Sequence, residues 1–281
     1  MIYYCFIGIA AVMFGLQFFF NREFQQNEGN GLAKTVVFSF ITSAAIAVIM
    51  FVINKGKFEF PPFSCAMAFL AALVGVTFTY FSVLAFDKVN LSVYSLFSML
   101  GGMILPVIYG VAFYAEDFSL KRVLCVAVII AALFIGTDLK ADKKTLLYCI
   151  AVFMLNGLAG VVSKCHQSSA MATSSSNFMQ IKSIITLLIC GVYMLVTGTK
   201  ISLSKPAKSI RAAVCFAFMT GIANLLVLIA LVHVNASVQY PMITGGTIVV
   251  SVIISLVCKE KVTYKNILSA VLALAATLLI I

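Results

Sequence analysis

The sequence predicts an all-α membrane protein with ten transmembrane helices in two inverted five-helix repeats. Its composition, its division into apolar stretches and an internal repeat lead to this prediction. Of 281 residues, 63% are hydrophobic and 10% are charged, and the mean hydropathy is +1.12. A soluble domain is about half apolar and about a quarter charged, so this composition excludes both a soluble globule and a disordered chain. A membrane β-barrel would alternate with period two, whereas residues 123–135 are continuously apolar.

Ten apolar stretches are long enough to form transmembrane helices. A helix needs about 20 mostly apolar residues to cross a bilayer, and polar clusters divide the chain into stretches near that length. The links are short, so we expect consecutive helices to be antiparallel neighbours, with no soluble domain between them. The expected spans are 2–20, 32–53, 64–86, 92–113, 119–137, 145–163, 174–197, 209–232, 237–257 and 263–281.

The chain also repeats itself at about half its length, with a spacing of 144 or 145 residues. Ala85, Val89, Asn90, Ser92 and Val93 recur as Ala230, Val234, Asn235, Ser237 and Val238, and Gly101-Gly102 and Glu116 recur as Gly245-Gly246 and Glu260. The halves, residues 1–140 and 141–281, hold five expected spans each. Because five is odd, the second half enters the membrane from the opposite side. Such inverted repeats are typical of secondary transporters; a duplicated channel or scaffold is the alternative.

Three segments of the first half carry a resemblance to a known family. They are residues 86–93 (FDKVNLSV), the pair Gly101-Gly102 and residues 116–122 (EDFSLKR), with second copies at 234–238 and 260–263. They resemble the EamA-like branch of the drug/metabolite transporter superfamily, and the resemblance covers the whole chain. The chain departs from that pattern at Ala115 and Lys259, where the family usually has Gly, and at Phe14, where it often has Trp.

The resemblance implies a ten-helix transporter in which helices one to four and six to nine surround a central cavity. Members commonly export amino acids, related metabolites or drugs by alternating access. We therefore expect a small-molecule substrate, no cofactor and a multi-pass location in the plasma membrane, here a bacterial inner membrane. Multidrug efflux by the same fold is the alternative function. We expect a monomer, with a homo-oligomer left open.

No catalytic or metal centre is expected. The sequence has no Gly-x-x-x-x-Gly-Lys-Ser/Thr phosphate loop, and its two histidines, His166 and His233, lack the HExxH context of a zinc site. No set of His, Asp and Ser residues converges within the spans, so the protein is not expected to be an enzyme. The net charge of +10 concerns orientation in the membrane and does not imply a nucleic-acid partner.

Ionisable residues are nearly absent from the expected spans. None of the nine acids lies in the middle of a span. The related small multidrug resistance proteins use a first-helix glutamate to exchange protons for cationic drugs, so its absence disfavours a carboxylate-driven cation antiporter. Lys182 is the one basic candidate inside a span, and an ammonium facing the cavity would suit a substrate carboxylate. The alternative is a lysine whose stem lies in lipid and whose charge reaches the interface.

Other polar residues lie in helices that the resemblance places around the cavity. Each could bind a polar substrate, and for each the alternative is a hydrogen bond between helices. With Lys182, the candidate substrate-binding residues are Gln17, Tyr80, Tyr94, Ser98, Asn156, Asn224, Gln239, Tyr240 and Thr244.

Basic residues are distributed unequally between the two expected sides of the membrane. We call the side that holds both termini side A; its links carry 5 Lys and Arg residues against 13 on side B. The positive-inside rule would place side B in the cytoplasm, whereas the resemblance implies cytoplasmic termini. Because the first helix usually dominates orientation, we expect side A to be cytoplasmic.

Overall fold

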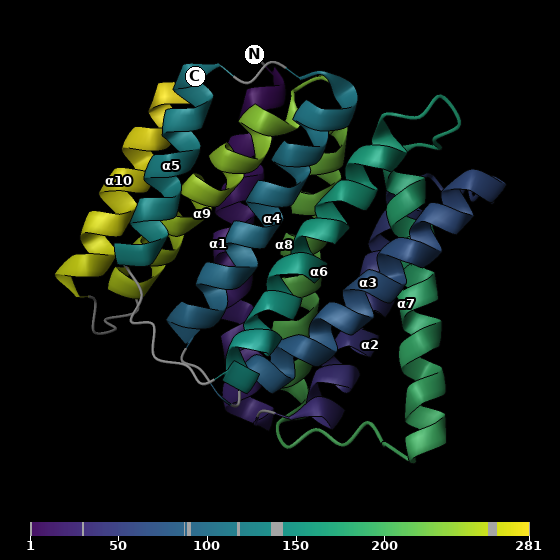
Figure 1. Cartoon of the computed structure of the whole chain (residues 1–281). Coiled ribbons are helices and arrows are strands. Elements are labelled where there is room, and N and C mark those ends of the chain that lie inside the picture. The colour runs from purple at the N-terminus through teal and green to yellow at the C-terminus, as the bar shows by residue number, and fades with distance from the viewer. Residues whose placement is uncertain are drawn as a thin grey trace.

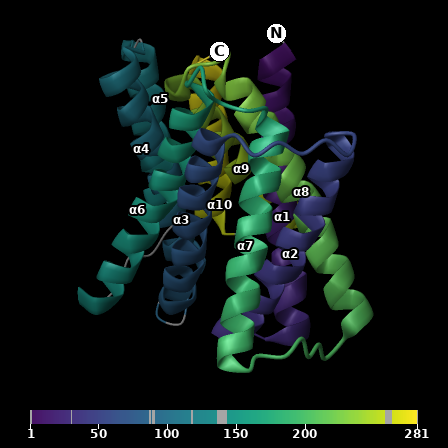
Figure 2. The ribbon, with the colours of Figure 1, turned by 90° about the vertical axis from the view of Figure 1, so that its right-hand side faces the viewer.

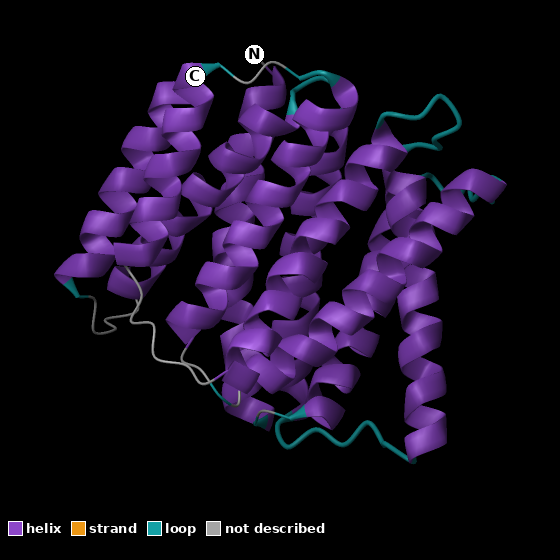
Figure 3. Ribbon diagram, in the orientation of Figure 1, coloured by secondary structure: helices purple, strands orange, loops and turns teal. Residues whose placement is uncertain are grey.

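The fold, seen in a computed structural model, is all-helical, as predicted. The structure describes residues 2–29, 31–86, 88, 91–116, 119–135, 143–257 and 263–280, and these contain no β-strand (Figure 1, Figure 3). The helices are α1 (Ile2–Glu28), α2 (Leu32–Ile53), α3 (Pro62–Phe86), α4 (Leu91–Tyr114), α5 (Leu120–Ile135), α6 (Lys143–Gln167), α7 (Ser175–Thr197), α8 (Pro206–Leu231), α9 (Ala236–Val257) and α10 (Tyr264–Ile280).

The length and composition of the helices confirm a membrane protein. In the part of the chain that the structure describes, eight helices are long and apolar enough to cross a bilayer, while α5 and α10 have only 16 and 17 residues. The count of ten spans therefore stays a prediction. Large apolar side chains cover the outer surface; Phe113 is 72% exposed and Leu195 is 84% exposed. Such a surface suits contact with lipid tails, which are as apolar as the side chains themselves.

The first helix extends beyond its predicted end at residue 20. Its last two turns carry charged residues, yet Phe24 is only 2% exposed and its ring centroid lies 4.6 Å from that of Phe38 in α2. Ala212 and Ala213 of α8 complete this small core. The segment is helical because it packs on protein, and a search for apolar runs cannot detect a helix of this kind.

Six helices form two three-helix bundles. In the first bundle, α6 packs against α3 and α4; in the second bundle, α1 packs against α8 and α9. The two bundles meet where α4 lies against α9. Outside the bundles, α2 packs against α7, and α5 pairs with α10 at one edge of the molecule (Figure 1). Both termini lie at the same end of the molecule, which we call the side-A end (Figure 1, Figure 2).

Part of the repeated motif falls outside the described residues. This applies to the recurring positions Val89, Asn90 and Glu260, and to Lys259, where the sequence departs from the family pattern. The same holds for Asp87, Asp117, Phe118, Asp138, Lys140, Asp142 and Lys261.

Candidate functional site

Three of the candidate binding residues form hydrogen bonds inside the first bundle. The hydroxyl groups of Tyr94 in α4 and Ser82 in α3 lie 2.9 Å apart. The Asn156 side-chain amide in α6 donates to the Ser98 carbonyl oxygen in α4 at 2.7 Å and to the Ser98 hydroxyl at 3.2 Å. Gly102 makes room for that amide, because a Cβ atom there would lie 2.8 Å from the Asn156 Nδ2 atom.

Three more candidates form hydrogen bonds inside the second bundle. The Gln17 Oε1 atom in α1 accepts from the Thr220 hydroxyl of α8 at 2.6 Å, and Asn224 donates to the Thr220 carbonyl oxygen at 2.8 Å. Gln239 of α9 is fully buried and donates to the Val227 carbonyl oxygen of α8 at 2.7 Å. Within the described residues, the Gln239 Oε1 atom accepts no hydrogen bond.

Tyr240 is the candidate that joins the two bundles. Its hydroxyl in α9 donates to the Gly160 carbonyl oxygen of α6 at 3.2 Å. Thr244 lies one turn further along α9 and Ser237 about one turn earlier, so these three residues share one face of the helix. That face is directed at the first bundle, because Tyr240 reaches α6 from it.

Among the residues that the structure describes, no hydrogen bond, ion pair or ring contact joins Lys182 or Tyr80 to another candidate. Lys182 is half-buried on the flank of α7, between the buried face with Ser183 and the exposed face with Leu188 and Val192. Within the described part of the chain, its ammonium makes no hydrogen bond or ion pair. Tyr80 is 46% exposed and its ring contacts Phe81 edge-on.

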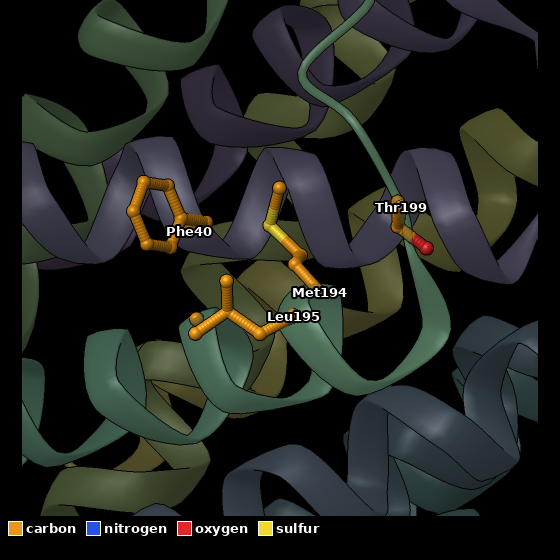
Figure 4. A pocket seen from close by; sticks show the side chains of 5 residues that line it. Phe40, Met194, Leu195 and Thr199 are labelled. Carbon is orange, nitrogen blue, oxygen red and sulfur yellow. The ribbon is translucent and has the colours of Figure 1, made fainter.

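A shallow apolar hollow lies between α2 and α7. It is lined by Phe40, Gly191, Met194, Leu195 and Thr199, of which only Thr199 has a polar side chain (Figure 4). Leu195 is 84% exposed, so the hollow opens at the outer surface of the protein. It contains none of the candidate binding residues.

A buried ion pair at the side-A end was not predicted from the sequence. The Glu116 carboxylate, in the link after α4, lies 2.6 Å from the Lys164 ammonium of α6, and these residues are 8% and 6% exposed. The same carboxylate accepts from the backbone N–H groups of Ala236 and Ser237 at 3.0 and 3.1 Å. Glu116 thus caps the start of α9, where the helix dipole also favours a negative charge.

The surroundings of Glu116 hold its carboxyl in the ionised form. Burial alone would raise its pKa, but the hydrogen bond from Lys164 and those from the two α9 amides outweigh burial, so the pKa lies below its ordinary value. Gly110 leaves space for the carboxylate, because a Cβ atom there would lie 2.8 Å from the Glu116 Oε2 atom. The Lys164 ammonium also lies 5.4 Å from the centroid of the Tyr114 ring.

A second buried acid caps a helix at the opposite end. The Glu28 carboxylate, at the end of α1, accepts from the N–H groups of Ser204 and Lys205 at 2.8 and 3.1 Å. It also accepts from the Ser209 hydroxyl at 2.6 Å and pairs with Lys34 at 3.3 Å. The donors Ser204, Lys205 and Ser209 lie in α8 or just before it, so Glu28 joins α1 and α8 within the second bundle. Glu116, in contrast, connects the two bundles.

The sequence contained only part of the signal for Glu116 and Lys164. Glu116 opens a repeated motif, which singled it out, but Lys164 corresponds to Phe19 or Phe20 in the first half and has no repeated counterpart. The contact between them depends on the packing of α4 against α6, which no local pattern encodes.

Comparisons with known proteins show the fold and nothing narrower. No family model matches the chain, and no curated protein matches its sequence. Among the solved structures that match, one crystal structure superimposes with a TM-score of 0.79 over 97% of this chain and 94% of that chain, at 11% sequence identity.

Proposed function

We propose that the protein is a secondary transporter that moves small organic metabolites across the cytoplasmic membrane by alternating access. Amino acids or related polar compounds are the proposed substrates, and export is the proposed direction. The observation that carries the proposal is a packing pattern in which each half of the chain matches the other.

The helix contacts keep their pattern when the halves are exchanged. Replacing each helix by the one five places away turns the second bundle, α1 with α8 and α9, into the first bundle, α6 with α3 and α4. The contacts of α2 with α8 and of α7 with α3 exchange in the same way. The pairs α2–α7, α4–α9 and α5–α10 each map onto themselves. One departure is that α10 packs more extensively on α9 than α5 does on α4.

Individual contacts recur at the repeat spacing. The hydrogen bond between Ser82 and Tyr94 corresponds to the one between Val227 and Gln239, both 145 residues later. The close approach of Gly15 to Val250 corresponds to that of Gly160 to Pro106.

The direction of the helices supports inversion. Glu28 places the end of α1 beside the start of α8, while Lys164 and Glu116 place the end of α6 beside the start of α9. Since α9 begins just after α8 ends, the ends of α1 and α6 lie at opposite ends of α8. The equivalent helices α1 and α6 therefore run in opposite directions, which supports the proposal of two inverted repeats.

This arrangement supports a pathway between the two bundles. The candidate polar residues lie in the helices that form the bundles, and Lys182 provides a positive charge in the neighbouring helix α7. We propose that Lys182 binds a carboxylate of the substrate. The acids that the structure describes, Glu23, Glu28, Glu59 and Glu116, lie at helix ends or in links, which argues against efflux of cations driven by a mid-membrane carboxylate.

Metabolite profiling of cells and medium, with and without expression, tests the proposal. A compound that accumulates in the medium on expression would then be assayed for uptake into proteoliposomes containing the purified protein. We expect saturable flux of a carboxylate-bearing compound. Flux only of lipophilic cations would instead favour multidrug efflux, and absence of any flux would favour a scaffold.

A further inference from the structure

We propose that Glu116 and Lys164 form a latch that holds the two bundles together at the side-A end and separates whenever that end opens. The inference rests on the proposed transport function. Alternating access requires contacts that close one end of the pathway and then break, and the structure contains a group of this kind at one end.

The latch connects elements that rocking would move apart. Glu116 follows α4 and Lys164 lies in the last turn of α6, so both belong to the first bundle, while Ala236 and Ser237 begin α9 in the second bundle. Lys164 orients and neutralises the carboxylate, and the carboxylate holds the start of α9. Separation of the bundles at this end removes both amide donors from Glu116.

Two further hydrogen bonds involve the same face of α9, and of these the one from Tyr240 connects the two bundles. The Arg122 guanidinium of α5 donates to the Ser237 hydroxyl at 3.2 Å. Deeper along the same face of α9, the Tyr240 hydroxyl donates to the Gly160 carbonyl oxygen. The Tyr240 bond joins two neutral groups, so it is weaker than a bond to a charged group. Glu116 accepts two hydrogen bonds on a charged group from the start of α9, so it is a stronger polar connection between the bundles than Tyr240.

The charge on Glu116 makes the latch a switch between two states. Breaking a buried ion pair by removing one partner is strongly destabilising, because the other charge is left buried without compensation. When the side-A end opens, water can solvate the Glu116 carboxylate and the Lys164 ammonium. The stability of the open state therefore does not depend on the ion pair. Neutralising either group therefore weakens the closed state more than the open state and shifts the population toward opening.

A cysteine behind the latch reports opening. Thr244 is 8% exposed and lies on the same α9 face as Ser237 and Tyr240, deeper in the protein. The experiment uses Thr244→Cys with all native cysteines except Cys125 replaced, in nanodiscs treated with a membrane-impermeant thiol reagent. Cys125 is fully buried in α5 and reports unfolding in the same sample.

We expect Glu116→Gln and Lys164→Met each to speed labelling at position 244 at least about tenfold, while labelling of Cys125 stays slow. Lys164→Met is the second variant because it leaves the Glu116 cap on α9 in place. Glu28→Gln is the matched control, since it neutralises a buried helix-capping acid within one bundle, and it should not speed labelling at 244.

Unchanged labelling at 244 in both latch variants would overturn the proposal. Faster labelling of both cysteines would also overturn it, because the pair would then be a cap needed for folding and not a latch. Flux assays separate the latch from the transport function. If the wild-type protein shows flux but neither latch variant labels faster at position 244, the latch is rejected and transport stands. If the wild-type protein shows no flux, transport is rejected, and with it a latch on a transport pathway.

Discussion

Gly101 of α4 lies directly against the main-chain carbonyl of Phe153 in α6, so closely that a Cβ atom at this position would overlap the carbonyl. The glycine allows the backbones of two helices in the first bundle to approach. A helix backbone cannot yield as a flexible side chain can, so Gly101→Ala must push α4 and α6 apart. We expect it to destabilise the protein by about 2–3 kcal/mol, the upper range for overpacking, measured by thermal or denaturant unfolding in detergent.

Gly8 is the control for this prediction. It lies in α1, and a Cβ atom added there would have no other atom within 4 Å, so Gly8→Ala adds helix propensity without a clash. It should be neutral or stabilise by up to about 1 kcal/mol. Equal effects of the two substitutions would show that α4 and α6 are not packed backbone to backbone.

The sequence predicted the helices better than the contacts between them. Apolar runs and polar punctuation located the ten helices of the described residues, because burial in lipid or protein is a property of each segment. The last turns of α1 were missed, since their stability comes from Phe24 packing on Phe38. Among the candidate residues, Asn156 and Ser98 bond to each other, but no local pattern says which polar side chain meets which. The importance of Lys164 was missed for the same reason.

Ala115 adopts a backbone conformation that favours glycine. Its φ angle is 49°, in the left-handed region, which costs an L-residue about 1–2 kcal/mol. In the family that the sequence resembles, this position is usually Gly. We expect Ala115→Gly to stabilise the protein by about 1 kcal/mol, seen as a higher unfolding midpoint. Ala112→Gly, inside α4, should instead destabilise by about 0.5–1 kcal/mol, and a loss of stability at both positions would contradict the assigned strain.

Stability should depend on pH through Glu116. Its carboxyl pKa lies below the ordinary value of 4.5 in the folded protein, so the ionised group contributes stability that is present above that ordinary value. The contribution is lost as the pH falls through the lowered pKa. Wild type should therefore exceed Glu116→Gln in unfolding midpoint at pH 7, and the difference should shrink as the pH falls below about 4. A difference that stays constant down to pH 3 would exclude this linkage.

The orientation in the membrane can be measured at two positions. Side A holds both termini (Figure 1), and we expect it to be cytoplasmic because the first helix usually dominates orientation over the total count of charges. A cysteine tag at the C-terminus should then resist an impermeant reagent in intact cells. A cysteine at Ser202, in the exposed link between α7 and α8 at the other end, should react. The reverse pattern would mean that the 13-to-5 excess of basic residues on side B sets the orientation.

Lys182 should be required for flux of a substrate that carries a carboxylate. Its ammonium has no ion-pair partner in the described residues, and an unpaired charge in a membrane protein is costly unless water or a ligand reaches it. We expect Lys182→Met to reduce proteoliposome flux at least about tenfold, the effect of losing one charged hydrogen bond of about 1.5–3 kcal/mol, while Lys182→Arg retains part of it. Lys208→Met, which removes an exposed lysine of α8, should leave flux unchanged. Full flux in Lys182→Met would mean that the lysine extends to the membrane surface and takes no part in binding.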